Sequence, residues 1–130
     1  MKITQQILDQ LTEQAKVSPR LRMNFDLRNS ADDKSQRMLN AIEPGSPLPI
    51  HRHTASSETV VCLRGRLREI FYSDTKEVLK VVEIAPGSDC VAVDIPLGVW
   101  HSVEVLESGT VILEVKDGPY VPISSDDILE

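Results

Sequence analysis

One stretch of the chain decides the fold: Gly45-Ser-Pro-Leu-Pro-Ile-His51-Arg-His53-Thr-Ala-Ser-Ser-Glu58-Thr-Val-Val-Cys-Leu-Arg-Gly65. Side chains alternate across a β-strand, so His51 and His53 are expected on the same strand face. The small polar residues 54–57 predict a turn, after which Glu58 begins a second strand that ends at Gly65. Two imidazoles and a carboxylate indicate a metal site, because these groups are the usual protein ligands of iron, manganese, nickel and zinc.

The third and last histidine lies in the segment Ile95-Pro-Leu-Gly-Val-Trp-His101. Its Pro-x-Gly turn places His101 at the start of a valine-rich strand. All three histidines of the protein therefore belong to two turn-and-strand units. With Glu58 they form a ligand set for one divalent metal ion, Fe, Zn, Ni or Mn, with one or two coordination positions left open.

The first stretch resembles the first motif of the cupin superfamily, G-x5-H-x-H-x3,4-E-x6-G. The motif is matched in full, at every spacing, by Gly45, His51, His53, Glu58 and Gly65. The resemblance implies an all-β cupin fold, which is a double-stranded β-helix or jelly-roll barrel, and it implies that the histidines and the glutamate bind metal.

The segment around the third histidine resembles the second cupin motif, G-x5-P-x-G-x2-H-x3-N. It is matched at Pro96, Gly98 and His101. Cys90 and Val105 replace the first glycine and the final asparagine. Those two positions shape turns and packing, so the departures leave the set of metal ligands complete.

A narrower resemblance covers almost the whole chain. Five segments are similar to the WbuC family of cupin-fold metalloproteins: residues 18–25, 36–45, 49–53, 63–67 and 114–120. The resemblance implies a metal bound in a β-barrel and an association with bacterial surface-polysaccharide gene clusters. It implies no particular reaction.

The composition fits one compact domain and excludes two classes of partner. The chain has 130 residues, of which 41% are hydrophobic, and a net charge of −6. That length supports a real core. The sequence contains no basic patch interleaved with aromatic residues, so nucleic-acid binding is not expected. It also contains no apolar run that approaches the roughly 20 residues of a membrane span. The polar start, Met1-Lys-Ile-Thr-Gln-Gln, lacks the apolar region of a signal peptide, so a cytoplasmic location is expected.

The chain divides into three parts within this single domain. Residues 1–18 predict an amphipathic helix, with Thr4 as its N-cap, that packs on the barrel or contacts a second copy in a homodimer. Residues 19–120 form the barrel, with strands expected over 21–27, 36–42, 58–64, 66–72, 77–84, 90–95, 101–106 and 110–116. Residues 121–130 are expected to be a polar tail that frays.

Four further residues are candidates for the pocket or for support of the ligands: Arg37, Asn40, Cys62 and Trp100. Arg37 and Asn40 lie on opposite faces of one strand, and either could meet the cavity or a loop. Cys62 shares strand parity with Glu58, so it is expected inside the barrel, as a buried hydrophobe or as a thiol near the metal. Trp100 precedes His101 and is a core or mouth-lining aromatic or a stacking platform.

Two classes of function fit these features. The first is a metal-dependent enzyme, of the isomerase or oxygenase type, acting on a small polar metabolite such as a sugar derivative. The second is a metal-containing module that binds or senses a small molecule without turnover. Specific catalytic residues are not identified by the sequence, since no second catalytic carboxylate or lysine stands out near the histidines.

Overall fold

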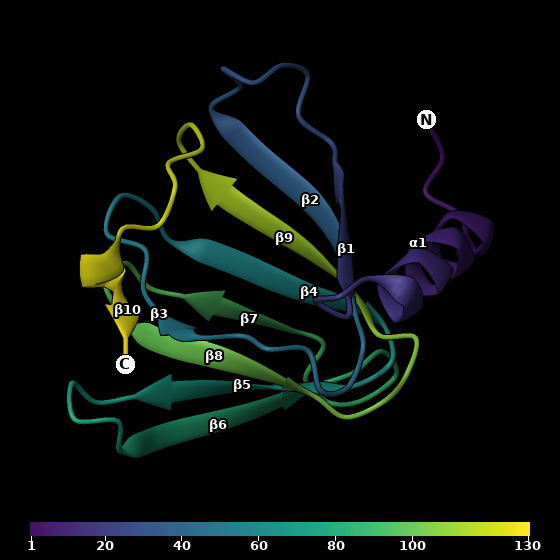
Figure 1. Ribbon diagram of the computed structural model, residues 1–130. Helices are drawn as coiled ribbons and strands as arrows, with labels where there is room; N and C mark the ends of the chain where they lie inside the picture. The colour runs from purple at the N-terminus through teal and green to yellow at the C-terminus, as the bar shows by residue number, and fades with distance from the viewer.

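The computed structural model describes residues 1–130 and shows two five-stranded antiparallel sheets packed face to face (Figure 1). The first sheet contains, in spatial order, β1 (Arg22–Asp26), β2 (Ser35–Ile42), β9 (Val111–Asp117), β4 (Glu58–Arg64) and β7 (Ala92–Ile95). The second contains β10 (Ile128–Leu129), β3 (Ile50–His51), β8 (Trp100–Val105), β5 (Leu67–Tyr72) and β6 (Val78–Ile84). This arrangement confirms the predicted all-β class with one N-terminal helix.

The main apolar core lies in the space between the two sheets. Strand alternation directs every second side chain inward. The buried core side chains are Ile42, Val60, Cys62, Leu67, Phe71, Ile84, Ile95, Val105 and Ile112. The same strands also bury polar side chains, among them Glu58 on β4, which lies opposite Ile95, and His101 on β8, which lies opposite Phe71.

The helix α1 (Gln5–Val17) packs on the outer face of the first sheet, next to β1 (Figure 1). The Thr4 hydroxyl accepts a hydrogen bond from the Ile7 backbone N–H at 3.4 Å and caps the helix. A second apolar cluster joins the helix to the sheet through Leu8, Leu11, Ala15, Leu39, Ala41 and Val111. At 13 residues, the helix is not long or apolar enough to cross a membrane.

The C-terminal segment differs from the expected fraying tail. Residues Ser125–Asp127 form a short 3-10 helix, and β10 pairs with β3, with Ile128 opposite His51. Asp127 contacts Arg52 twice, because its carboxylate accepts from Arg52 Nε at 3.0 Å and its carbonyl accepts from the Arg52 backbone N–H at 3.0 Å. The tail therefore completes the second sheet and braces the strand that carries the first histidine.

Candidate metal centre and cavity

The two predicted turn-and-strand units bring the three histidines together. His51 ends β3 and pairs directly with His101 on β8, and their ring centroids are 4.3 Å apart. β3 is only two residues long, so His53 lies just beyond it in a loop rather than on a continuous strand. That loop is tied to the second unit because the Gly98 backbone N–H donates to the His53 carbonyl at 2.8 Å.

The backbone orients two of the imidazoles. His51 Nδ1 lies 3.0 Å from the Pro49 carbonyl oxygen, and His101 Nδ1 lies 2.9 Å from the Val99 carbonyl oxygen. A carbonyl only accepts, so each Nδ1 carries the proton and each Nε2 keeps its lone pair. The ligating atoms of the three histidines all lie within 4.8 Å of one another. A metal-binding imidazole needs one ring nitrogen held by such a hydrogen bond and the other left free for the ion.

Glu58 joins the cluster from the opposite sheet, at the first position of β4. Its Oε2 lies 3.0 Å from His53 Nε2, 3.9 Å from His101 Nε2 and 3.9 Å from Lys116 Nζ. Burial opposes the ionisation of Glu58, but the contact with His53, the charge of Lys116 and the neighbouring His101 outweigh it and lower its pKa to about 2. Glu58 is therefore a carboxylate at neutral pH.

The geometry fits a metal ion better than a hydrogen-bonded pair. His53 Nε2 and Glu58 Oε2 are both buried and lie 3.0 Å apart, yet neither atom has a hydrogen-bond partner. Two ligand atoms that each lie about 2.1 Å from one ion, at an angle of roughly 90°, are separated by about 3.0 Å. The separation of Glu58 from His53 thus fits two ligands of one ion, and the three histidines form a candidate metal site beside it.

His51 and His101 are neutral near pH 7, because both pKa values are lowered. Burial, then the neighbouring His101, lowers the pKa of His51 to about 4, although its bond to Pro49 opposes the shift. Burial likewise lowers the pKa of His101, against the opposing effect of the Val99 carbonyl. A neutral imidazole binds metal without first losing a proton. These two ligands are therefore ready for metal at neutral pH.

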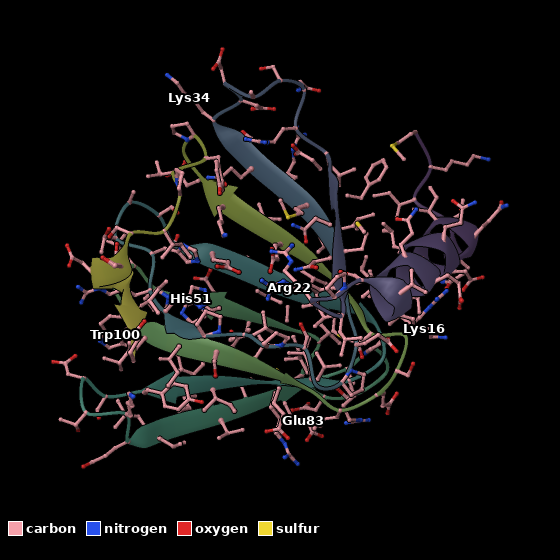
Figure 2. The ribbon with its side chains drawn as sticks, in the orientation of Figure 1. Lys16, Arg22, Lys34, His51, Glu83 and Trp100 are labelled. Atoms are coloured by element: carbon pink, nitrogen blue, oxygen red, sulfur yellow. The ribbon has the colours of Figure 1, made fainter.

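A cavity of about 380 Å³ opens between the sheets at this site. Figure 2 labels His51 and Arg22, both of which lie between the two sheets. Besides the four predicted ligands, the polar side chains of its lining are those of Arg20, Arg22, Asn24, Asn40, Glu69, Glu114, Lys116 and Tyr120. The cavity is therefore mostly polar on the first sheet and has a single carboxyl group, Glu69, in the middle of the second.

Two carboxyl groups face this cavity from opposite sheets, and both have raised pKa values. Glu69 on β5 is fully buried, and neither of its oxygens has a hydrogen-bond partner. Burial first, then the negative charges of Glu58 and Glu114, raises the pKa of Glu69 well above its ordinary value. Burial and then the charge of Glu58 also raise the pKa of Glu114 to about 7, although Lys116 opposes the shift. Glu69 therefore holds a proton at neutral pH, and Glu114 can gain or lose one.

This protonation predicts how the stability of a Glu69→Gln variant depends on pH. Above about pH 4.3 the unfolded glutamate ionises while folded Glu69 stays protonated, so wild-type stability falls with rising pH by up to about 1.4 kcal/mol per pH unit for this one group. Glutamine does not ionise. The variant should therefore gain stability relative to wild type between pH 5 and pH 8, measured by urea unfolding with a chelator present.

A glutamate on the next strand supplies the control for that measurement. The exposed Glu83 on β6 is paired with Arg66 and Arg68, which lower its pKa. Stability from such a group is lost only as pH falls through its folded pKa, so Glu83→Gln should give a difference that stays flat from pH 5 to pH 8. A flat difference for Glu69→Gln as well would contradict the protonated state.

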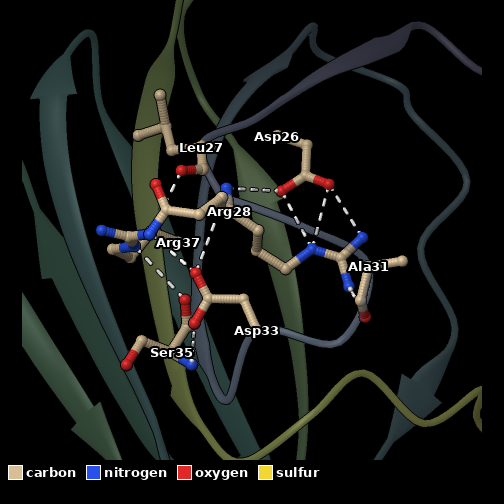
Figure 3. A network of polar contacts seen from close by, with 8 residues as sticks. Asp26, Leu27, Arg28, Ala31, Asp33, Ser35 and Arg37 are labelled. Carbon is tan, nitrogen blue, oxygen red and sulfur yellow. Dashed lines mark hydrogen bonds and ion pairs between the residues drawn. The ribbon is translucent and has the colours of Figure 1, made fainter.

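Of the four predicted pocket residues, only Asn40 lines the cavity. Arg37 lies on the other face of β2, where its guanidinium pairs with Asp33 at 3.0 Å and donates to the carbonyls of Leu27 and Ser35 (Figure 3). Of the two alternatives for Arg37, the structure therefore shows the contact with a loop rather than with the cavity, because strand parity turns Arg37 away whenever Asn40 faces in.

Cys62 and Trp100 also lie away from the cavity. Cys62 is inside the sandwich as expected, but it packs in the apolar core, and its thiol donates to the Arg64 carbonyl at 3.3 Å. Trp100 is buried on the outer face of β8, where its indole N–H donates to Asp74 at 3.0 Å and Arg52 lies over its ring. Neither residue lines the cavity that holds the histidines.

Sequence reasoning missed the charged residues of the cavity: Arg20, Arg22, Glu69, Glu114 and Lys116. A signal existed for Glu69, which alternates with the apolar Leu67 and Phe71 and so occupies an inward position. The other four depend on pairing between strands that are distant in sequence. No second carboxylate or lysine stood out in the sequence, yet the folded chain places Glu69, Glu114 and Lys116 in the cavity lining.

Solved structures with the same architecture identify the fold. The chain superimposes on KdgF from Halomonas sp. with a TM-score of 0.61 at 13% identity, covering 80% of this chain and 85% of that one. It matches an oxalate oxidase in complex with the substrate analogue glycolate with a TM-score of 0.66 at 13% identity, covering 84% of this chain and 57% of that one. The protein has a cupin fold.

A longer relative in structure is the oxalate decarboxylase of Bacillus subtilis, in a study of its Mn(II) centres. The TM-score is 0.58 at 18% identity, with 84% of this chain and 27% of that one covered. By sequence, residues 3–84 match the family described as "Domain of unknown function (DUF6016)", and the chain belongs to that family. No curated protein matches the sequence.

Proposed function

We propose that this protein is a metal-dependent enzyme that acts on a small polar metabolite, a sugar or sugar derivative, with the metal held by His51, His53, Glu58 and His101. One observation carries the proposal: neutral imidazoles and a carboxylate converge at the wall of a cavity of about 380 Å³ that also contains protonatable carboxyl groups. The resemblance to WbuC proteins supports a role in bacterial surface-polysaccharide biosynthesis, and a cytoplasmic location agrees with that role.

The cavity combines a candidate site for a divalent ion with carboxyl groups that can carry a proton. A divalent ion there would polarise a carbonyl or hydroxyl oxygen or acidify a bound water, and iron, zinc, nickel and manganese all suit mixed imidazole and carboxylate ligation. Glu114, with a pKa of about 7, can accept or donate a proton at neutral pH, as a general acid or base must. Glu69 holds its proton and can donate a hydrogen bond to the substrate.

A metal-containing module that binds or senses a small molecule without turnover is the second candidate. The buried polar groups of Asn40 and Glu69 favour it, because their unpaired oxygens can hold a ligand whether or not a reaction follows. Such a module needs the pocket but not an exchangeable metal position. The two candidates therefore separate on whether turnover exists and requires metal.

The Glu58→Gln variant tests the proposal. Glutamine keeps the shape of Glu58 but removes the charge, so we expect metal affinity to fall by about 10- to 100-fold while the fold persists. Metal content is measured after anaerobic purification, and turnover is screened on sugars, sugar acids and sugar nucleotides. In an enzyme, turnover falls together with metal, whereas in a binding module ligand affinity survives through Asn40 and Glu69. Unchanged metal content and preference would show that Glu58 is not a ligand and leave a three-histidine site.

We also propose a homodimer. The apolar face of α1 is used within the chain, so the helix is not the favoured contact. The edge strand β6 supports the proposal better, because its Val78, Leu79 and Val81 side chains are exposed and its outer edge has no partner strand. Exposed apolar edge strands are surfaces on which a second chain can pair.

A further inference from the structure

Two of the arginines in this protein form no ion pair. Six of the eight arginines form ion pairs with carboxylates, and these are Arg28, Arg37, Arg52, Arg64, Arg66 and Arg68. The remaining two, Arg20 and Arg22, form none, and both line the cavity of the candidate metal centre. In a protein with 20 acidic residues, the two arginines that form no ion pair are thus gathered in the same cavity.

The position of this arginine pair is electrostatically unfavourable without an anion. Arg22 extends from β1 into the space between the sheets, and its guanidinium donates to the Pro47 carbonyl at 3.1 Å (Figure 2). Burial first, then the like charge of Arg20, lowers the pKa of Arg22, and the nearby Glu114 opposes the shift only in part. Arg20 is exposed at the cavity mouth. Two guanidinium groups repel each other, and a bound carboxylate or phosphate removes the repulsion and accepts bidentate hydrogen bonds.

A second, independent observation points to a ligand in the same cavity. The Asn40 side chain is only 8% exposed, and its Oδ1 has no hydrogen-bond partner. Glu69 is 0% exposed, and neither of its oxygens has a partner. Buried polar groups in folded proteins are nearly always paired, so these atoms call for hydroxyl groups or water. A carboxylic acid and an amide together donate to and accept from the hydroxyls of a carbohydrate.

We propose that the cavity binds a hydroxylated anion of monosaccharide size, with its carboxylate or phosphate on Arg20 and Arg22 and its hydroxyl groups toward Asn40, Glu69 and the metal centre. The volume of about 380 Å³ supports that size, since it lies near the low end of the roughly 300–1,000 Å³ of ligand pockets. This inference rests on the proposed function only in sharing its cavity, and it specifies the class of substrate.

Calorimetric titration of the metal-loaded protein with three probes tests the inference. The probes are D-glucuronate, D-glucose 6-phosphate and the neutral D-glucose. Charge-assisted hydrogen bonds to guanidinium groups predict that at least one anion binds about 10- to 100-fold more tightly than glucose. The anion that binds more tightly shows whether the arginines bind a carboxylate or a phosphate. Equal affinity for all three probes, or no binding of either anion, would overturn the proposal.

Variants then locate the anion. Arg20→Gln, and Arg20→Gln combined with Arg22→Gln, should remove the preference for the anion and leave the affinity for glucose unchanged. The control is Arg68→Gln, which removes an equal charge from the outer face of β5, where Arg68 pairs with Glu83 at 3.2 Å. Retention of the preference in both cavity variants would assign the anion to the metal and overturn the arginine site. Since Arg20 is exposed, its single variant should keep the fold even if loss of Arg22 does not.

The same titration of a variant without histidine ligands separates this inference from the proposed function. An anion preference that persists in His51→Ala with His53→Ala, together with no metal-dependent turnover in wild type, would reject the enzyme and retain the arginine site. Metal-dependent turnover without an anion preference would reject the arginine site and retain the enzyme.

Discussion

Protein carrying both His51→Ala and His53→Ala should purify with less than a tenth of the divalent metal that wild type holds. Two of four ligands are lost, and the remaining pair, Glu58 and His101, is too small a set to retain a divalent ion against a chelating wash. Metal content per chain is measured by inductively coupled plasma mass spectrometry after anaerobic purification. Wild type should carry close to one ion per chain.

The fold of that double variant should survive, because β3 is held on both sides by β8 and β10 through backbone pairing. Circular dichroism checks this. Thr54→Ala is the matched control, since it truncates an exposed side chain one residue after His53 and should leave metal content at the wild-type level. Full metal retention by the double variant would reject the assignment of these two histidines.

The histidine cluster could be predicted from sequence because the information for it is local. Two short segments hold all three histidines, and each segment combines a turn with the start or end of a strand. Strand alternation predicted that His51 and His53 lie on one continuous strand, but His53 lies beyond its end. The strand ends at His51, and the loop position of His53 is fixed instead by the hydrogen bond from Gly98, 45 residues along the chain.

The pocket lining could not be predicted in the same way, because both faces of β2 are apolar and buried. Leu39 and Ala41 pack under α1, while Ile42 joins the core between the sheets. Alternation alone therefore cannot say whether Arg37 or Asn40 faces the cavity. The placement of Arg22 and Glu114 requires, in addition, that β1, β2 and β9 pair in register. This register joins residues 12 to 20 positions apart between β1 and β2, and 70 to 82 positions apart between β2 and β9.

The tail shows a related limit of sequence patterns. The segment Ser124-Ser-Asp-Asp127 is polar and reads as a terminus that frays. Its order depends on Asp127 meeting Arg52, a residue that lies between the two histidines of the first motif. Only the folded arrangement brings the end of the chain to the strand that it stabilises.

The Gly65→Ala substitution should be among the most destabilising single changes in this protein. Gly65 follows β4 with φ +84°, a backbone conformation that costs an alanine about 1–3 kcal/mol. A Cβ there would lie 2.7 Å from the Cα of Thr110, and nearer still to the Thr110 hydroxyl oxygen, so a buried backbone must move. Overpacking of this kind adds about 1–3 kcal/mol or more. The total, about 2–6 kcal/mol, is a large part of the 5–15 kcal/mol that stabilises a typical domain.

Gly87→Ala separates the two contributions to that loss. Gly87 has a similar φ of +75°, but a Cβ added there meets nothing within 4 Å. Its alanine variant should therefore lose only the conformational part, about 1–3 kcal/mol, in urea unfolding monitored by circular dichroism. Thr110 explains why Gly65→Ala should lose more unfolding free energy than Gly87→Ala. The buried Thr110 hydroxyl donates to the Glu107 carbonyl at 2.7 Å and accepts from the Arg66 N–H at 3.2 Å, so Thr110 cannot move away without breaking both bonds. Equal losses for the two variants would contradict this account. A larger loss for Gly65→Ala would show that the last glycine of the motif is required by the close approach of the chain at Gly65 to Thr110, a structural role distinct from the metal binding proposed for the histidines and Glu58.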